Sequence, residues 1–64
     1  MKVKYDREVD ILYIRIADSP VEESDEERPG TVIDYDAEGR VVGIEIMNAS
    51  KRVTRPDAIE LEIA

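Results

Sequence analysis

The acidic residues with the most regular spacing lie in the segment DYDAEGRVVGIEI, residues 34–46. Its acids and Gly39 fall at positions one, three, six and twelve of the EF-hand loop pattern, and a glutamate takes the fifth position. Carboxylates at such alternate positions bind Ca²⁺ where a glycine lets the loop turn sharply. The candidate ligands for a divalent metal are Asp34, Asp36, Glu38 and Glu45.

An internal repeat relates this segment to the start of the chain. Residues 3–16, VKYDREVDILYIRI, align with residues 33–46, IDYDAEGRVVGIEI, with five identities in fourteen positions. In both copies apolar and polar residues alternate on each side of a short acidic stretch, which is typical of two strands joined by a turn. We therefore predict two duplicated β-hairpins, although unrelated hairpins would also share turn residues.

The repeat argues against a calcium loop. In the first copy Lys4 stands in the place of Asp34, and Arg15 in the place of Glu45, so two candidate ligands are reversed in charge. An EF-hand loop also needs a helix on each side, whereas strand periodicity surrounds this segment. A turn explains the shared acids better than a metal site does.

The residues that the copies share are those that a hairpin turn requires. Asp6 and Asp36 can each accept hydrogen bonds from backbone amides two residues on. Gly39 can adopt a positive φ at little cost, whereas Val9 stands at the equivalent place in the first copy, so the two turns must differ. The predicted turn residues are Asp6, Glu8, Asp36 and Gly39, with the register defined to within one residue.

An acidic connection, residues 17–30, joins the two copies. We expect a solvated loop there, with a short edge strand around residues 21–24. A short helix is predicted after Met47, with Asn48 or Ser50 as its N-cap.

The final residues 58–64, AIELEIA, alternate Ile and Leu with Glu, which favours a strand. Asp57 and Glu60 have capping-box spacing, so a short helix is the alternative. The expected fold is mainly β (α+β at most) in one domain of residues 1–64. Two duplicated hairpins form an antiparallel meander, followed by a short helix and a C-terminal strand.

Composition excludes several classes of site. The chain of 64 residues has no Cys and no His, which removes disulfides, thiolate or histidine metal sites and a histidine base. The serines have no base to activate them, so we predict no catalytic residue and no cofactor. A net charge of −7, from 16 acids and 9 bases, repels phosphate backbones and predicts no nucleic-acid partner. With no apolar run of ~20 residues and no signal core, we expect a cytoplasmic protein without a membrane partner.

Apolar residues also occur out of phase with the main apolar stripe. A sheet that is covered on both faces carries apolar residues on both. Either the C-terminal segment or another chain must therefore cover the second face, which we predict to be a homodimer or partner interface. The interface candidates are Ile11, Tyr13, Val32, Val41 and Met47.

Two motifs resemble a known family. The segments KYDREVDILYI at 4–14 and RPGTVIDYDAEGRVVGIEIMNAS at 28–50 are similar to the prokaryotic family called domain of unknown function 2283. The resemblance implies a small, mostly β protein and no established activity. Of the matching residues, Gly43 is expected to let Tyr13 or Tyr35 lie over its strand. Glu45 is expected to pair with a basic residue, and its candidate partners are Lys4, Arg15 and Arg52.

The most consistent function is that of a small non-enzymatic module acting through protein association. Its partner would be a second copy or another protein, and the acidic connection suggests an antitoxin-like neutraliser of a basic protein. The alternative is a protein that binds a divalent metal or a small ligand through its acidic turn residues.

Overall fold

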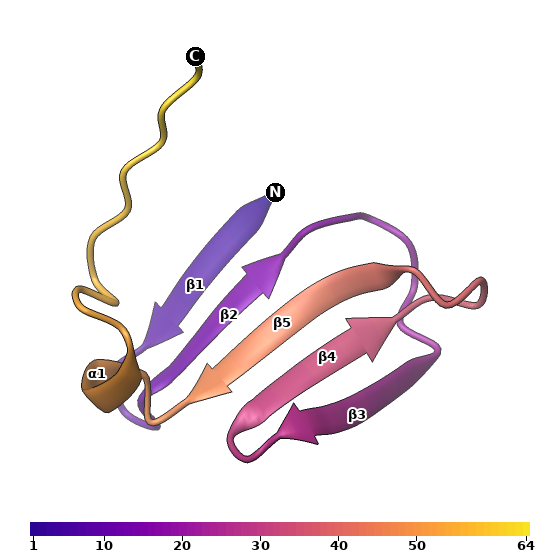
Figure 1. Cartoon of the computed structure of the whole chain (residues 1–64), viewed down its shortest axis with the longest axis horizontal. Helices are drawn as coiled ribbons and strands as arrows, with labels where there is room; N and C mark the ends of the chain where they lie inside the picture. The colour runs from indigo at the N-terminus through magenta and orange to yellow at the C-terminus, as the bar shows by residue number, and fades with distance from the viewer.

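Alternating β-branched and polar residues build one antiparallel sheet, as the sequence predicts. The computed structural model describes residues 1–64, and a short helix follows the last strand (Figure 1). The elements in chain order are β1 (Lys2–Asp6), β2 (Ile11–Arg15), β3 (Glu23–Arg28), β4 (Thr31–Tyr35), β5 (Val41–Met47) and α1 (Ala49–Arg52). The mainly β fold with a short helix after the strands is thereby confirmed. No helix has the length and apolar character needed to cross a membrane.

The strands lie in the order β1-β2-β5-β4-β3, so the two predicted hairpins join through their second strands. After β2 the chain crosses to the far edge of the sheet, where β3 begins, and then returns through β4 to β5 (Figure 1). The edge strand β3 spans residues 23–28, two residues later and longer than the predicted strand around residues 21–24.

The two hairpins share their pairing register up to a bulge in the second, where Tyr35 lies opposite Val41 whereas Tyr5 lies opposite Leu12. Val3 lies opposite Ile14 in the first, and Ile33 lies opposite Ile44 in the second, thirty residues on in each case. Ile14 in turn lies opposite Ile44 where the hairpins meet. This geometry agrees with a duplicated hairpin, and the duplication itself stays a prediction.

Directly opposed residues share a face of a sheet, so the register defines two faces. We call one the core face; it carries Val3, Tyr5, Leu12, Ile14, Ile33, Ile44 and Ile46. We call the other the open face; it carries Lys4, Ile11, Tyr13, Val32, Gly43, Glu45 and Met47.

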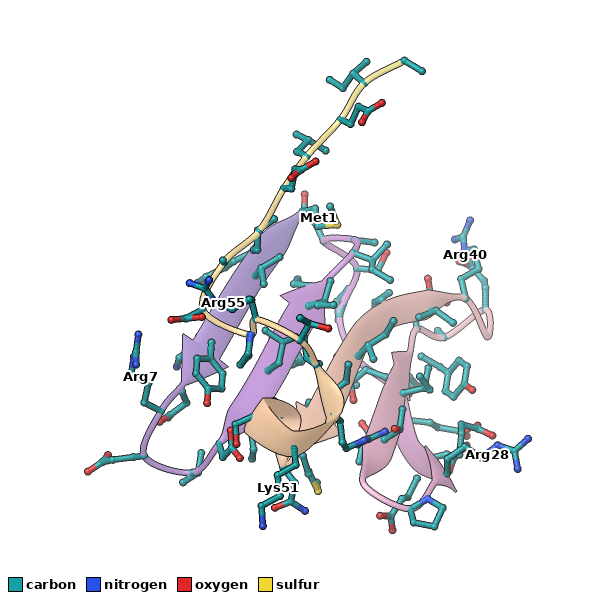
Figure 2. All side chains as sticks on the ribbon, turned by 60° about the vertical axis from the view of Figure 1, so that its left-hand side comes forward. Met1, Arg7, Arg28, Arg40, Lys51 and Arg55 are labelled. Carbon is teal, nitrogen blue, oxygen red and sulfur yellow. The ribbon has the colours of Figure 1, made fainter.

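The helix and the segment after it lie on the core face. Ala49 of α1 is fully buried, at 0% exposure, and Figure 2 shows the helix in front of the sheet. Val53 and Pro56 line a shallow apolar pocket with Leu12 and Ile14. The C-terminal segment therefore does not cover the open face.

The residues after Ala58 are extended, as the predicted strand requires, but they form no backbone hydrogen bond with the sheet. Figures 1 and 2 show this segment running past Met1 and away from the strands. Its apolar side chains Ile59, Leu61 and Ile63 are exposed.

Candidate functional site

The structure separates the four candidate metal ligands. Asp36 and Glu38 lie in the β4–β5 turn, whereas Asp34 and Glu45 lie on the open face. No three carboxylates are grouped as a metal ion would require. The EF-hand spacing therefore does not become a common coordination site in this fold.

The carboxylate of Asp36 accepts its hydrogen bonds from residues of its own turn. Its Oδ1 accepts hydrogen bonds from the backbone N–H of Glu38 and of Arg40, both at 2.9 Å, and its Oδ2 lies 3.3 Å from Arg40 Nε. Because these donors favour the charged carboxylate, the amide of Arg40 first among them, the pKa of Asp36 is lowered. Gly39 has a φ of 78° and so supplies the left-handed residue that this hairpin turn requires.

The first turn has the same Asp-to-amide bond and a left-handed residue, but at a different position. Asp6 Oδ1 accepts the N–H of Glu8 at 3.0 Å, which matches the bond from Glu38 to Asp36. The left-handed residue is Asp10, with a φ of 57°, one place later than the glycine of the second turn. Asp tolerates this conformation better than the β-branched Val9 does, and this explains how a turn without glycine closes.

Asp10 also holds the helix, through what we call the Asp10 clamp. Its Oδ1 accepts the backbone N–H of Ser50 at 2.9 Å, its Oδ2 accepts the Ser50 hydroxyl at 2.7 Å, and its carbonyl accepts the N–H of Ala49 at 3.0 Å. The hydroxyl of Tyr5 donates a fourth bond at 2.6 Å. Asn48 does precede the helix, but its side chain forms no capping bond. Asp10 therefore caps α1 from a distant turn.

The clamp shifts the pKa of both of its acidic groups. The Tyr5 hydroxyl and then the two Ser50 donors lower the pKa of Asp10, because they stabilise its charged form. The same bond raises the pKa of Tyr5, since ionisation would remove the donor. The clamp is intact when Asp10 is charged and Tyr5 is neutral.

A second cluster lies on the open face, where Gly43 leaves room for Tyr13. A Cβ atom at Gly43 would lie 2.7 Å from the Tyr13 hydroxyl and 3.0 Å from Asp34 Oδ2. The Tyr13 hydroxyl donates to Asp34 at 3.2 Å, and Ser24 donates to the other oxygen at 2.6 Å. Asp34 is only 7% exposed, so this carboxylate links β2, β3 and β4 from a buried position. Of the two tyrosines expected over Gly43, Tyr13 is the one found there.

A pocket of about 390 Å³ opens beside this cluster. Its walls come from strands and turns only; they are Lys4, Asp6, Val9, Ile11, Tyr13, Asp34 and Glu45. Glu45 lines this pocket, whereas Ser50 does not. The structure shows no nucleophile beside a base here.

Glu45 does not form the predicted ion pair with Lys4, Arg15 or Arg52. Arg15 instead donates to the carbonyls of Ala17 and Ser19, both at 2.6 Å. Arg52 ties α1 to the β3–β4 turn and to the end of β5. Its guanidinium donates to the carbonyls of Gly30 and Met47 and to the hydroxyl of Thr31.

Four of the five interface candidates lie on the open face: Ile11, Tyr13, Val32 and Met47, all partly exposed. Val41 departs from this set. A bulge in β5 shifts the register, so that Val41 lies opposite the core-face residue Tyr35. At a bulge two successive residues lie opposite one, so the pairing departs from the alternation of the sequence there. The role of Val41 in an interface stays a prediction.

Comparison with known proteins identifies the family. Residues 2–50 match the family model described as "Protein of unknown function (DUF2283)", which covers most of the chain. The chain belongs to this family. No curated protein and no solved structure matches the chain significantly. In this DUF2283 member the matched region includes the sheet and the first residues of α1, and with them Asp10 and the residues that it bonds in the clamp.

Proposed function

We propose that this DUF2283 protein is a non-enzymatic module that associates with a second copy of itself through the open face. The observation that carries the proposal is that no segment of the chain covers this face. The helix and the segment after it lie on the opposite side, and the open-face pocket is lined by the sheet and its turns alone.

The apolar content of the open face supports an interface. Ile11, Tyr13 and Met47 are grouped at one end of β2 and β5, and Val32 lies on the neighbouring β4. Few residues of the chain are buried: of the apolar side chains, only Leu12, Val42 and Ala49. A domain of this size gains little from its own core, so covering a second face would add to stability.

The charges of the open face support a second copy as the occupant. Basic residues lie on the β1–β2 side: Lys2, Lys4 and Arg15. The accessible acids Glu45 and Glu26 lie on the β5-β4-β3 side, where Asp34 is buried, and Asp6 is the one acid on the basic side. A two-fold interface brings the same surface of both copies together. Rotation about a two-fold axis parallel to the strands would set the basic side of each copy against the acidic side of the other.

Light scattering of the intact chain across a tenfold dilution tests the proposal. We expect a mass of two copies that falls toward one on dilution, and falls sooner at high salt because ions screen the charge pairs. Val32→Lys should shift the dissociation to at least ten times higher concentration. Its matched control is Val21→Lys, at a side chain 41% exposed outside the face, which should leave the mass unchanged.

A mass of one copy at every concentration would refute self-association. A separate protein partner would then become the leading explanation. In that case the exposed acidic strand β3, with Glu23, Asp25, Glu26 and Glu27, would be the surface that an antitoxin-like role requires.

A further inference from the structure

The C-terminal segment after Ala58 is extended and pairs with no strand (Figure 1). Ile59, Leu61 and Ile63 are 67%, 76% and 88% exposed, and they alternate with Glu60 and Glu62. No backbone group after Ala58 bonds to the sheet. A two-sided extended segment with free backbone groups can add to the edge of a sheet, where main-chain hydrogen bonds supply affinity and alternate side chains supply specificity.

The sheet has two edges, and charge distinguishes them. The edge strand β3 is acidic, with Glu23, Asp25 and two further glutamates, and would repel a segment that carries Glu60 and Glu62. The other edge strand, β1, presents Lys2 and Lys4. The complementary edge is therefore β1.

One antiparallel pairing of residues 60–62 with β1 matches charge on one face of the strand and apolar side chains on the other. With Leu61 opposite Val3, Glu60 falls opposite Lys4 and Glu62 opposite Lys2. Each carboxylate then meets an ammonium group on the open-face side, and the apolar residues extend the core face beside Val3. A shift by one residue would set glutamates against apolar residues, because side chains alternate across a strand.

In the structure this segment lies beside its own β1 without pairing with it. Ile59 lies with Val3 and Met1 in the apolar pocket and with Val3 and Tyr5 in a second one. The residues after it run past Met1 (Figure 2) without a backbone hydrogen bond to β1. Each copy thus has a free strand and a free edge that it does not use itself. We infer that residues 59–63 add as a sixth strand to β1 of a second copy, which gives the same strand in return.

This inference rests on the proposed self-association and shares Lys2 and Lys4 with it, but engineered cysteines at other positions test it separately. The natural chain has no Cys, so Val3→Cys and Leu61→Cys each introduce one thiol. When the two single variants are mixed under mild oxidation, we expect the mixed disulfide to form at least ten times faster than with Asp25→Cys, on the acidic edge, in place of Val3→Cys. Adding Glu60→Lys and Glu62→Lys to the Leu61→Cys chain should remove this advantage.

Equal rates with Val3→Cys and Asp25→Cys would overturn the inference. So would a chain with both cysteines at 3 and 61 that closes only within itself, since the strand would then serve its own sheet. If light scattering still gave two copies, the proposed function would stand without the exchanged strand. If light scattering gave a single copy and no mixed disulfide formed, both the proposed self-association and the exchanged strand would be refuted.

Discussion

At the scale of single residues, one carboxylate organises the junction between hairpin and helix. Asp10 joins Tyr5 on β1 to Ser50 on α1, across forty positions of sequence in the second case. Its left-handed backbone conformation directs both its side chain and its carbonyl toward the helix N-terminus. The helix has only four residues, too few for independent stability, so it depends on this clamp.

Replacing Asp10 should therefore release the helix. Asp10→Ala removes all the carboxylate bonds and places alanine at a positive φ, so we expect the thermal midpoint to fall by several degrees. Asp10→Asn should cost less, because Asn tolerates this conformation and keeps an acceptor oxygen. Ser50→Ala should also cost less, because the backbone N–H of residue 50 remains a donor.

The matched control for the charge is Asp18→Asn, at an exposed acid with no hydrogen bond from its side chain. Circular dichroism melts of the four variants at one protein concentration provide the measurement. An Asp10→Ala midpoint within a degree of that of Asp18→Asn would show that the helix does not need the clamp.

At the scale of elements, β2, β5 and β4 are held together by a contact that only glycine permits. The Tyr13 side chain crosses Gly43 to reach Asp34 on the far strand. The approach is closer than any real Cβ atom would allow, as the 2.7 Å separation indicates. The bond also places a buried carboxylate beside β3, through Ser24.

Gly43→Ala should destabilise the sheet by about 1–3 kcal/mol, as overpacking of a filled site does. The added methyl group would push the Tyr13 hydroxyl away from Asp34. Tyr13→Phe removes that hydroxyl, so in a double-mutant cycle the second change should cost less in the Gly43→Ala background. Urea unfolding of the four proteins measures the coupling, and additive losses would contradict the contact.

Local pattern predicted the hairpins, their turn acids and the short helix, because these depend on alternation and on turn chemistry within a few residues. The extent of β3 was not predictable in this way. Every side chain of β3 is exposed, and its acidic sequence has no apolar alternation; it is a strand because its backbone pairs with β4.

The clamp was missed for a different reason. Asp10 lies in the segment 4–14 that resembles the family, and Ser50 is a candidate helix cap, but their contact depends on how β5 returns beside β2. Both residues lie in the motifs that resemble the family, and this is the one sign in the sequence that they matter. The spacing of residues in the sequence cannot predict a contact that depends on the order of the strands in the sheet.

At the scale of the whole molecule, the pH range of stability depends on which acidic side chains form hydrogen bonds in the folded state. Asp10 and Asp36 have lowered pKa values because hydrogen-bond donors stabilise their carboxylates. In the alkaline range, a bond to Glu27 raises the pKa of Tyr35 to about 12. The chain has no His, the side chain whose ordinary pKa lies between about pH 5 and 8.

We therefore expect stability to change little at neutral pH and to fall at both extremes. For the acids, the folded pKa lies below the unfolded value of 3.8. Their contribution is complete above that value and is lost as the pH falls through the lowered pKa values. For Tyr35 the folded pKa lies above the unfolded value of 10.0. Its contribution is complete below pH 10.0 and is lost as the pH rises toward about 12.

A competing effect of net charge acts in the same acidic range. The charge of −7 at neutral pH destabilises the compact chain by repulsion, and this repulsion relaxes as the pH approaches the isoelectric point of about 4.4. Salt screens repulsion between exposed charges but acts little on the short bonds of Asp36. Acid unfolding at high salt should therefore isolate the contribution of the bonded carboxylates.

Asp36→Asn separates the two effects. The amide oxygen can still accept the turn N–H groups, but it has no charge to lose, so we expect a shallower loss of stability below pH 4 in high salt. Asp18→Asn changes the net charge equally without touching a bonded acid and should keep the slope of the natural chain. If both variants flatten the slope equally, overall charge governs acid unfolding and the turn carboxylate contributes nothing of its own.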